Sequence, residues 1–293
     1  MVKFIAAFAA VYLIWGSTYL AIKLAIATIP PFLMLSFRFI PAGLLLYALL
    51  RLRGIPAPTR REWFAAAGVG TLMLAGGVGA VAWAERSIHS GLAALLVAAV
   101  PMWMVLVDWI GPARRRPTRR VLIGLAVGFL GVGLIVGPSW EGAGMAGVWA
   151  VAAVMFGTMC WAIGSVYSRY LSLPQSSFMA SAIEMIAAGG SLFLLAVLFG
   201  DTRAFDPSIV SRESALAVGY LIVFGSLITY AAYVWLLHHT TPARVSSYAF
   251  VNPVVAMLLG VWLGDESFGL MAVVAAALVV TSVALVTLEK QTA

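Results

Sequence analysis

The sequence is poor in charge, in cysteine and in long polar segments. Only 10% of its 293 residues are charged, against about a quarter in a soluble domain, while 63% are hydrophobic. The mean hydropathy is +1.03, and no soluble fold hides this much apolar surface, so lipid has to surround most side chains. The single cysteine, Cys160, excludes an intrachain disulfide and a cysteine metal cluster.

Motifs for catalysis and nucleotide binding are also missing. We find no Walker A pattern, no GxSxG or HExxH motif and no paired-carboxylate site, so we expect no enzyme activity, no cofactor, no metal and no ATPase subunit. A net charge of +7 would suggest nucleic acid in a soluble protein. Here the basic residues fall in short loops between apolar runs, where they set orientation, so no nucleic-acid partner is expected.

The sequence does contain ten apolar runs, each able to form a membrane-spanning helix. Prolines, glycines and charged clusters separate them. The predicted helices are residues 4–27, 32–51, 63–84, 88–110, 119–137, 145–170, 177–200, 214–237, 242–263 and 268–288. The first run resembles a secretory signal peptide, but many runs follow, so we interpret it as an uncleaved first helix.

Lysine and arginine indicate how the helices are oriented. With both termini in the cytoplasm, 13 of these residues fall in inner loops and 3 in outer loops, while Lys23 and Arg38 lie within spans. We expect Lys23 to extend its amine to the outer interface. The sequence therefore predicts an all-α, multi-pass protein of the inner membrane, surrounded by lipid and present as a monomer or weak dimer.

The chain contains a weak internal repeat. A shift of 146 residues places Trp15 on Trp161 and "FLMLSFRFIPAGLLLYAL" on "FMASAIEMIAAGGSLFLL", and slightly longer shifts extend the match into later helices. We therefore predict two halves, residues 1–140 and 145–293, with five helices each. Because five is odd, the second half enters the membrane inverted, an architecture of secondary transporters whose substrate site lies between the halves.

Two charges lie deep in the predicted spans, at positions that the repeat makes equivalent. The shift of 146 places Arg38 on Glu184, and a lone charge at the bilayer centre is costly. We predict an intramembrane charge pair, with two interpretations left open. The pair is either a structural contact between the halves, or part of a site for substrate or a proton.

Aromatic, small and proline residues recur at matching places in both halves. Each first helix carries a Gly-Ser-x-Tyr segment, and prolines interrupt residues 88–110 and 242–263. Tight helix packing explains such residues, but interrupted helices at matching positions also mark transporter binding sites. The candidate substrate-binding residues are Trp15, Ser17, Tyr19, Trp83, Pro101, Trp103, Trp161, Tyr230, Tyr233, Ser247, Tyr248, Asn252 and Pro253.

At these residues the chain resembles the EamA-type, ten-helix branch of the drug/metabolite transporter superfamily. The segments that carry the resemblance are "LIWGSTYLAIKLA", "SFRFIPAGLLL", "AERSIHSGLAALLVAAVPMW", "RPTRRVLIGLAVGFLGVGLIV" and "VSSYAFVNPVVAMLLGVWLGDESFG". The resemblance implies an inverted-repeat bundle that exports amino acids or related metabolites, and it is strongest to bacterial exporters of aromatic and neutral amino acids.

The expected function is therefore export of a small molecule by alternating access. The aromatic side chains would pack the apolar part of the substrate. Ser17, Ser247 and Asn252, with carbonyls freed by Pro101 and Pro253, would hold its ammonium and carboxylate groups. The alternatives are an exporter of drugs or other metabolites, an intramembrane enzyme acting on lipid, and a structural membrane subunit.

Overall fold

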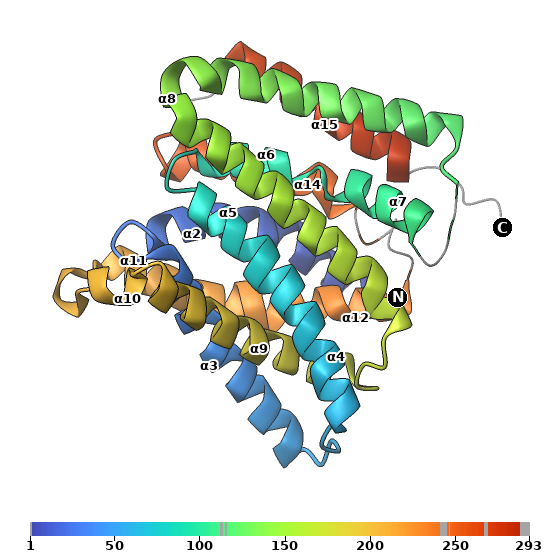
Figure 1. Ribbon diagram of the computed structural model, residues 1–293, viewed down its shortest axis with the longest axis vertical. Helices are drawn as coiled ribbons and strands as arrows, with labels where there is room; N and C mark the ends of the chain where they lie inside the picture. Colours follow the sequence, from blue (N-terminus) through green and yellow to red (C-terminus); the bar gives the residue numbers. More distant parts are fainter. Residues whose placement is uncertain are drawn as a thin grey trace.

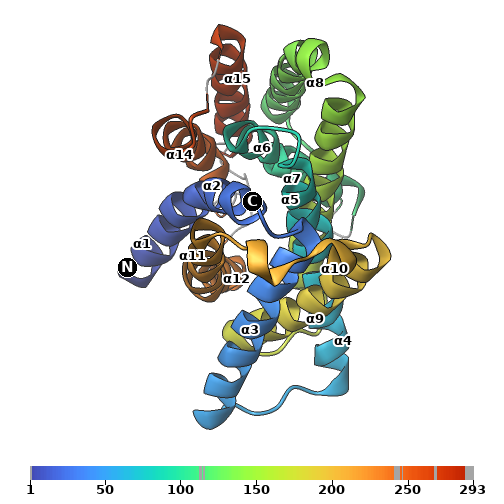
Figure 2. The same ribbon diagram turned by 90° about the vertical axis from the view of Figure 1, so that its left-hand side faces the viewer.

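The computed structural model describes residues 2–111, 114, 116–240, 245, 247–266 and 269–287. Every regular element within these residues is a helix (Figure 1). The long helices run side by side across the molecule. Figure 2 shows α8 with α15 on one side of the bundle and α3, α4 and α9 on the other.

The first half of the chain is built from four helical segments followed by the start of α8. They are α1–η1–α2 (Val2–Ala9, Ala10–Ile14, Trp15–Ala25), α3 (Pro31–Leu52), α4–η2–α5 (Arg60–Gly70, Thr71–Val78, Gly79–Ala84) and α6 with α7 (Ser90–Val97, Val100–Ile110). Thr59 caps the third segment through a capping box with Glu62. The predicted helices start and end within a few residues of these bounds.

The rest of the described chain is also helical. Its elements are α8 (Arg119–Tyr167), η3 (Ser168–Tyr170), α9 (Ser177–Leu198), the short α10 (Asp201–Ala204) and η4 (Pro207–Ile209), α11–η5–α12 (Arg212–Tyr220, Leu221–Tyr230, Ala231–His239), α14 (Tyr248–Leu263) and α15 (Leu270–Thr287). Part of the predicted helix 242–263, at 242–244 and 246, lies outside the described residues, as do residues 268 and 288 of the predicted helix 268–288.

One predicted boundary is wrong. We expected "GPSWEGAG" at 137–144 to separate two helices, but the backbone stays helical through α8 from Arg119 to Tyr167. Figure 1 shows that α8 instead bends back on itself, so that its two arms still run in different directions. In a low-water environment the backbone keeps its hydrogen bonds internal, so glycine and proline bend this helix rather than end it.

Length and composition support membrane insertion. Seven helical segments of the described chain are long and apolar enough to cross a bilayer, and Val251–Leu263 and Val273–Ser282 are shorter apolar helices. Large apolar side chains such as Leu130, Phe156 and Leu258 cover the outside. The chain is therefore an integral membrane protein, and the number of ten crossings stays a prediction.

Helices α3 and α9 pack along each other through two glycines (Figure 2). A Cβ added at Gly43 would lie 2.8 Å from Cγ1 of Ile186, and one added at Gly189 would lie 2.6 Å from Cγ1 of Ile40. A shift of 146 residues exchanges these two contacts, because it turns Gly43 into Gly189 and Ile40 into Ile186. The α3–α9 interface is therefore approximately self-complementary, as an interface across a two-fold axis is.

Candidate functional site: a central aromatic cavity

Within the part of the chain that the structure describes, three spans contain a wide π-helical turn, at η1, η2 and η5. Such turns leave carbonyl groups without their usual helical partners and often occur at functional sites. Side chains from other helices bind those carbonyls. Trp15 Nε1 donates to the Gly225 carbonyl at 3.2 Å. The side-chain amide of Asn252 faces the carbonyls of Val11 and Tyr12, and in the orientation that these acceptors require its nitrogen donates to them at 3.1 and 2.9 Å. The π-helical turns thus connect α14 and α2 to their neighbours.

Aromatic rings from four helical segments meet where these turns lie. Trp15 and Trp161, equivalent under the repeat, have ring centroids 5.4 Å apart in an edge-to-face arrangement. Tyr233 lies 5.0 Å from Trp15 and 5.3 Å from Trp161, and Tyr248 lies 5.5 Å from Trp15. Aromatic pairs prefer defined relative orientations, so we expect these four rings to pack in a fixed arrangement.

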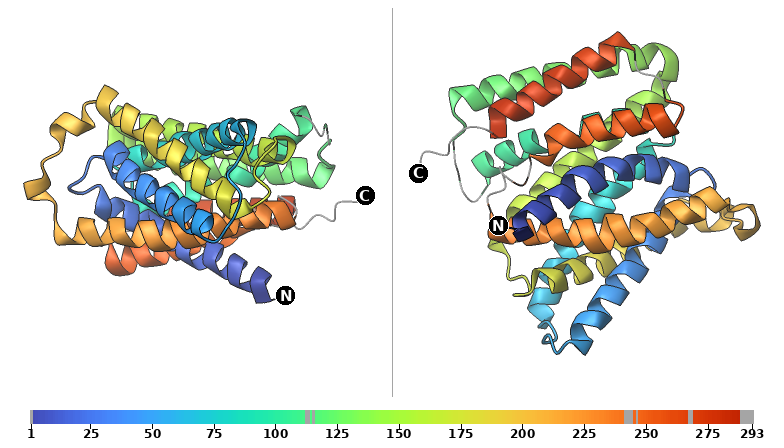
Figure 3. Two further views of the ribbon diagram at one scale, coloured as in Figure 1. Left: turned by 90° about the horizontal axis from the view of Figure 1, so that it is seen from below. Right: turned by 180° about the vertical axis from the view of Figure 1, so that it is seen from behind.

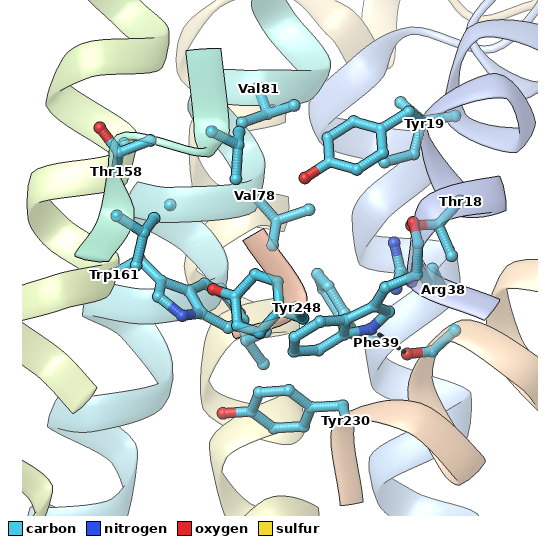
Figure 4. Close-up of a pocket in the computed structure, with 18 residues that line it drawn as sticks. Thr18, Tyr19, Arg38, Phe39, Val78, Val81, Thr158, Trp161, Tyr230 and Tyr248 are labelled. Atoms are coloured by element: carbon cyan, nitrogen blue, oxygen red, sulfur yellow. Dashed lines mark hydrogen bonds between the residues drawn. The ribbon is translucent and has the colours of Figure 1, made fainter. Parts of the chain in front are cut away.

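Trp15, Trp161 and Tyr248 border a cavity of about 70 Å³ in the middle of the protein (Figure 4). Among the predicted substrate-binding residues, those that line it are Trp15, Tyr19, Trp161, Tyr230 and Tyr248. The rest of the wall is mostly small or apolar and includes Thr18, Gly77, Val97, Val100, Gly157, Thr158 and Gly225. The cavity has room for about five water molecules.

Tyr233 supports the cavity from behind its lining. Its hydroxyl accepts a hydrogen bond from Trp161 Nε1 at 3.0 Å and lies 2.8 Å from the Ser165 hydroxyl. These bonds fix the ring of Trp161 at the cavity wall.

Pro101 does not interrupt a continuous helix, because it lies at the start of α7, just after α6 has ended. Val97 and Val100, on the two sides of this break, both line the cavity.

The other predicted site residues lie elsewhere. The hydroxyl of Ser17 donates to the Ile14 carbonyl at 2.7 Å, and that of Ser247 lies 2.6 Å from the Tyr12 hydroxyl. Asn252 and Pro253 are buried in α14, and Asn252 is occupied by η1 as described above. Trp83 packs against the core, and Trp103 lines a second, apolar cavity of about 480 Å³ between α7 and α8. None of these six side chains lines the central cavity, so the predicted role of Ser17, Ser247 and Asn252 as direct substrate ligands has no support in this conformation.

The two deep charges do not form an ion pair among the described residues. Arg38 is 4% exposed, and its Nε donates to the Ser226 hydroxyl at 2.9 Å. Glu184 is 1% exposed and accepts a hydrogen bond of 2.7 Å from the Tyr230 hydroxyl. Ser226 and Tyr230 are one helical turn apart on η5, so one helix binds both charges. Arg38 lines the central cavity, whereas Glu184 lies behind Tyr230.

Sequence reasoning missed the glycines and threonines of the cavity wall. Gly225 is the clearest example, because it lies beside Arg38 and its carbonyl accepts the Trp15 hydrogen bond. A glycine next to a serine in "FGSLITY" resembles the Gly-Ser segments of residues 4–27 and 145–170, and that similarity was the available signal.

A second polar cluster joins helix ends on one side of the bundle. Glu266 accepts hydrogen bonds from the amide and hydroxyl of Ser90, both at 2.7 Å, and from the amide of Gly91 at 3.2 Å. The carboxylate thus caps α6. Lys23 Nζ donates to the carbonyls of Glu85 and Ile88 at 2.6 and 3.0 Å, which gives the expected interfacial amine a defined partner at the end of α5.

Comparison with known proteins identifies the fold and the family. The model of the EamA-like transporter family matches residues 2–137 and 148–288. The chain belongs to this family. The uncharacterized inner membrane transporter YedA of Escherichia coli K12 is 40% identical to this EamA-family chain over 283 residues, covering 96% of the chain and 89% of YedA.

More distant relatives are similar over most of the chain. A WAT1-related chloroplastic protein of Arabidopsis thaliana, At3g02690, is 26% identical over 290 residues, which is 94% of the chain and 67% of the relative. A solved crystal structure superimposes with a TM-score of 0.70 at 22% identity over 98% of both chains, which shows the shared fold. The predicted family resemblance and the location in the inner membrane are therefore confirmed. The family is one of transporters, and YedA is named as an inner membrane transporter.

Proposed function

We propose that this EamA-type protein exports aromatic or neutral amino acids, or related small metabolites, by alternating access. The central cavity carries the proposal, because it lies among spans of both halves and its wall is rich in aromatic rings. Flat apolar rings suit the apolar body of such a substrate. Few charges surround it, which fits a broad substrate range and modest affinity.

The arrangement of the two halves supports alternating access. The contacts of Gly43 and Gly189 exchange under the repeat, and Trp15 meets its own equivalent, Trp161. An inverted repeat with such an axis can open to either side by exchanging the conformations of its halves. Figure 3 shows that α1 begins and α15 ends at the same end of the bundle, as two inverted halves of five crossings require.

The cavity is too small to hold an aromatic amino acid in the conformation that the structure represents. At about 70 Å³ it is much smaller than the roughly 300–1,000 Å³ of typical ligand pockets. An aromatic amino acid enters only if the surrounding helices move apart. The broken helix at α6 and α7 and the π-helical turns of η2 and η5 line this space, and they are the elements we expect to move.

Counterflow of labelled phenylalanine into proteoliposomes tests the proposal. Trp161→Ala is expected to lower transport efficiency roughly 3- to 10-fold, because one ring of the wall is lost. Trp149→Ala is the matched control, since Trp149 lies on the same helix and is 61% exposed on the outside. No counterflow of any amino acid or small metabolite by well-folded protein would contradict the proposed function.

A further inference from the structure

Arg38 places a guanidinium in the wall of the central cavity, and most of its hydrogen-bond donors have no partner among the described residues. Arginine has five N–H donors. In the described residues one of them, on Nε, binds the Ser226 hydroxyl, and the two Nη groups make no hydrogen bond. Arg38 is nevertheless 96% buried, and it lines the cavity (Figure 4). Four of its donors therefore have no hydrogen-bond partner among the described residues, in a side chain that lines an internal space.

The charge of Arg38 has no carboxylate partner in the described part of the chain. The described residues that line the cavity include no aspartate or glutamate. Glu184, at the equivalent position of the repeat, is bound to Tyr230 instead. Besides Ser226, the guanidinium lies beside the Phe39 ring, whose centroid is 4.7 Å from Cζ, and beside Gly225. A buried cation without a partner is costly, which favours binding of an anion.

The surrounding helices hold the guanidinium in place. A Cβ at Gly225 would lie 2.8 Å from Nη2 of Arg38, so a larger residue at this position of η5 would displace the guanidinium. Ser226, the next residue, orients Nε. The Gly225 carbonyl is in turn occupied by Trp15 Nε1, so it does not bind the guanidinium. The site is preorganised by η5, and its open side is the cavity.

We propose that Arg38 binds the carboxylate of the transported molecule, so that the cargo is a small monocarboxylate with an apolar or aromatic body. This inference depends on the proposed function, because it takes the cavity as the transport site. A guanidinium and a carboxylate form two parallel hydrogen bonds and neutralise each other. A phosphate dianion would leave a net negative charge in an apolar cavity, so it is disfavoured.

The same geometry indicates that an amino group on the transported molecule contributes little to its binding. The described lining offers an ammonium no carboxylate, only ring faces such as those of Trp15 and Trp161. Cation–π contacts with rings contribute less than a buried ion pair does. The carboxylate is therefore required for recognition, and the amino group is dispensable.

Three matched competitors test this assignment in wild-type proteoliposomes that exchange labelled phenylalanine. Unlabelled phenylalanine and 3-phenylpropionate, which lacks the amino group, are expected to compete. Phenethylamine, which lacks the carboxylate, and phenyl phosphate are expected to compete at least 10-fold more weakly. Equal competition by phenethylamine and 3-phenylpropionate would overturn the proposal and leave the proposed function intact.

Variants locate the effect at the guanidinium. Arg38→Gln is expected to weaken binding of 3-phenylpropionate on the order of 10- to 100-fold, and Arg38→Lys less, because lysine keeps the charge but not the paired donors. Gly225→Ala keeps the charge and displaces it, so it is expected to weaken binding as well. Arg203→Gln, at an exposed arginine of α10, is the control.

Binding is measured in parallel as the rise in melting temperature that each compound causes in detergent, because this readout does not require transport. Stabilisation of wild type by 3-phenylpropionate, lost in Arg38→Gln and in Gly225→Ala, supports the proposal even without counterflow, in which case only the proposed function fails. If no carboxylate stabilises the folded wild type, or if both variants bind as wild type does, the assignment is wrong.

Discussion

The pair Gly189 and Gly190 on α9 offers a strict test of the interface between α3 and α9. The two glycines are adjacent, but Gly189 is buried against α3 and Gly190 is exposed. A Cβ at Gly189 would lie 2.6 Å from Cγ1 and 2.9 Å from the backbone nitrogen of Ile40. A Cβ at Gly190 meets nothing within 4 Å. Alanine at these two positions should therefore have opposite effects.

The magnitudes follow from these contacts. Gly189→Ala presses a methyl group onto a backbone nitrogen that no rotamer change can move, so α3 and α9 have to separate by several tenths of an ångström. Overpacking of this kind costs about 1–3 kcal/mol. Gly190→Ala has no such clash, and replacing a mid-helix glycine by alanine stabilises a helix by about 0.5–1 kcal/mol. We therefore expect the two variants to differ by roughly 1.5–4 kcal/mol.

Thermal unfolding of both variants in detergent, with wild type between them, is the measurement. The Gly189 variant should melt below wild type and the Gly190 variant at or above it. A Gly43→Ala variant should behave as Gly189→Ala does, because its Cβ would lie 2.9 Å from the backbone nitrogen of Ile186. Equal melting temperatures for Gly189→Ala and Gly190→Ala would show that α3 and α9 do not pack in the way described.

The polar cluster at the helix ends yields two further predictions. Glu266→Gln should lower the free energy of unfolding by about 1.5–3 kcal/mol, because the glutamine NH2 group would face the Gly91 N–H in place of a carboxylate oxygen. Asp265→Asn is the control. Asp265 is exposed and has a φ of 50°, which asparagine also tolerates, so this variant should be neutral in the same melting assay. Burial, together with the nearby Glu266 carboxylate, raises the pKa of Glu85 well above 4.5. The folded state then keeps a proton that the unfolded state loses, so stability should fall as pH rises from about 4.5 towards the raised pKa. Glu85→Gln should reduce this decline between pH 5 and 8, and an unchanged slope would argue against a buried, neutral Glu85.

Much of the fold was predictable because lipid imposes a simple rule on the chain. Every backbone group has to be bonded inside the segment, so apolar runs become helices and loops concentrate the charges. Capping residues such as Thr59, Thr118, Ser176 and Ser211 mark helix starts as they do in water. The same rule explains the wrong boundary in α8, where glycine and proline suggested an end but the backbone stayed helical.

The candidate site was predictable only in part. Aromatic residues in matching segments of the two halves indicated the cavity, and Trp15 and Trp161 indeed meet there. The π-helical turns could not be predicted, because side chains of other helices bind their free carbonyls, as Trp15 does for Gly225. Local sequence does not reveal such tertiary partners.

The same limit applies to the two buried charges. The predicted repeat treated the helices that carry Arg38 and Glu184 as equivalent, and these helices, α3 and α9, pack together. It suggested a direct pair because it gave no information about a third helix. In the structure η5 supplies Ser226 to one charge and Tyr230 to the other, and so keeps them apart.

This separation affects the chemistry of the cavity. Backbone contacts between the halves are nearly symmetric, since Gly43 and Gly189 exchange roles, and such symmetry suits a site that opens to either side. The charges are not symmetric: the carboxylate of Glu184 is covered by Tyr230, and the guanidinium of Arg38 faces the cavity. Had the two formed an ion pair, the cavity would be neutral and would select only for shape. Because they do not, the described cavity wall carries one positive charge, which the monocarboxylate that we propose as cargo would neutralise during passage.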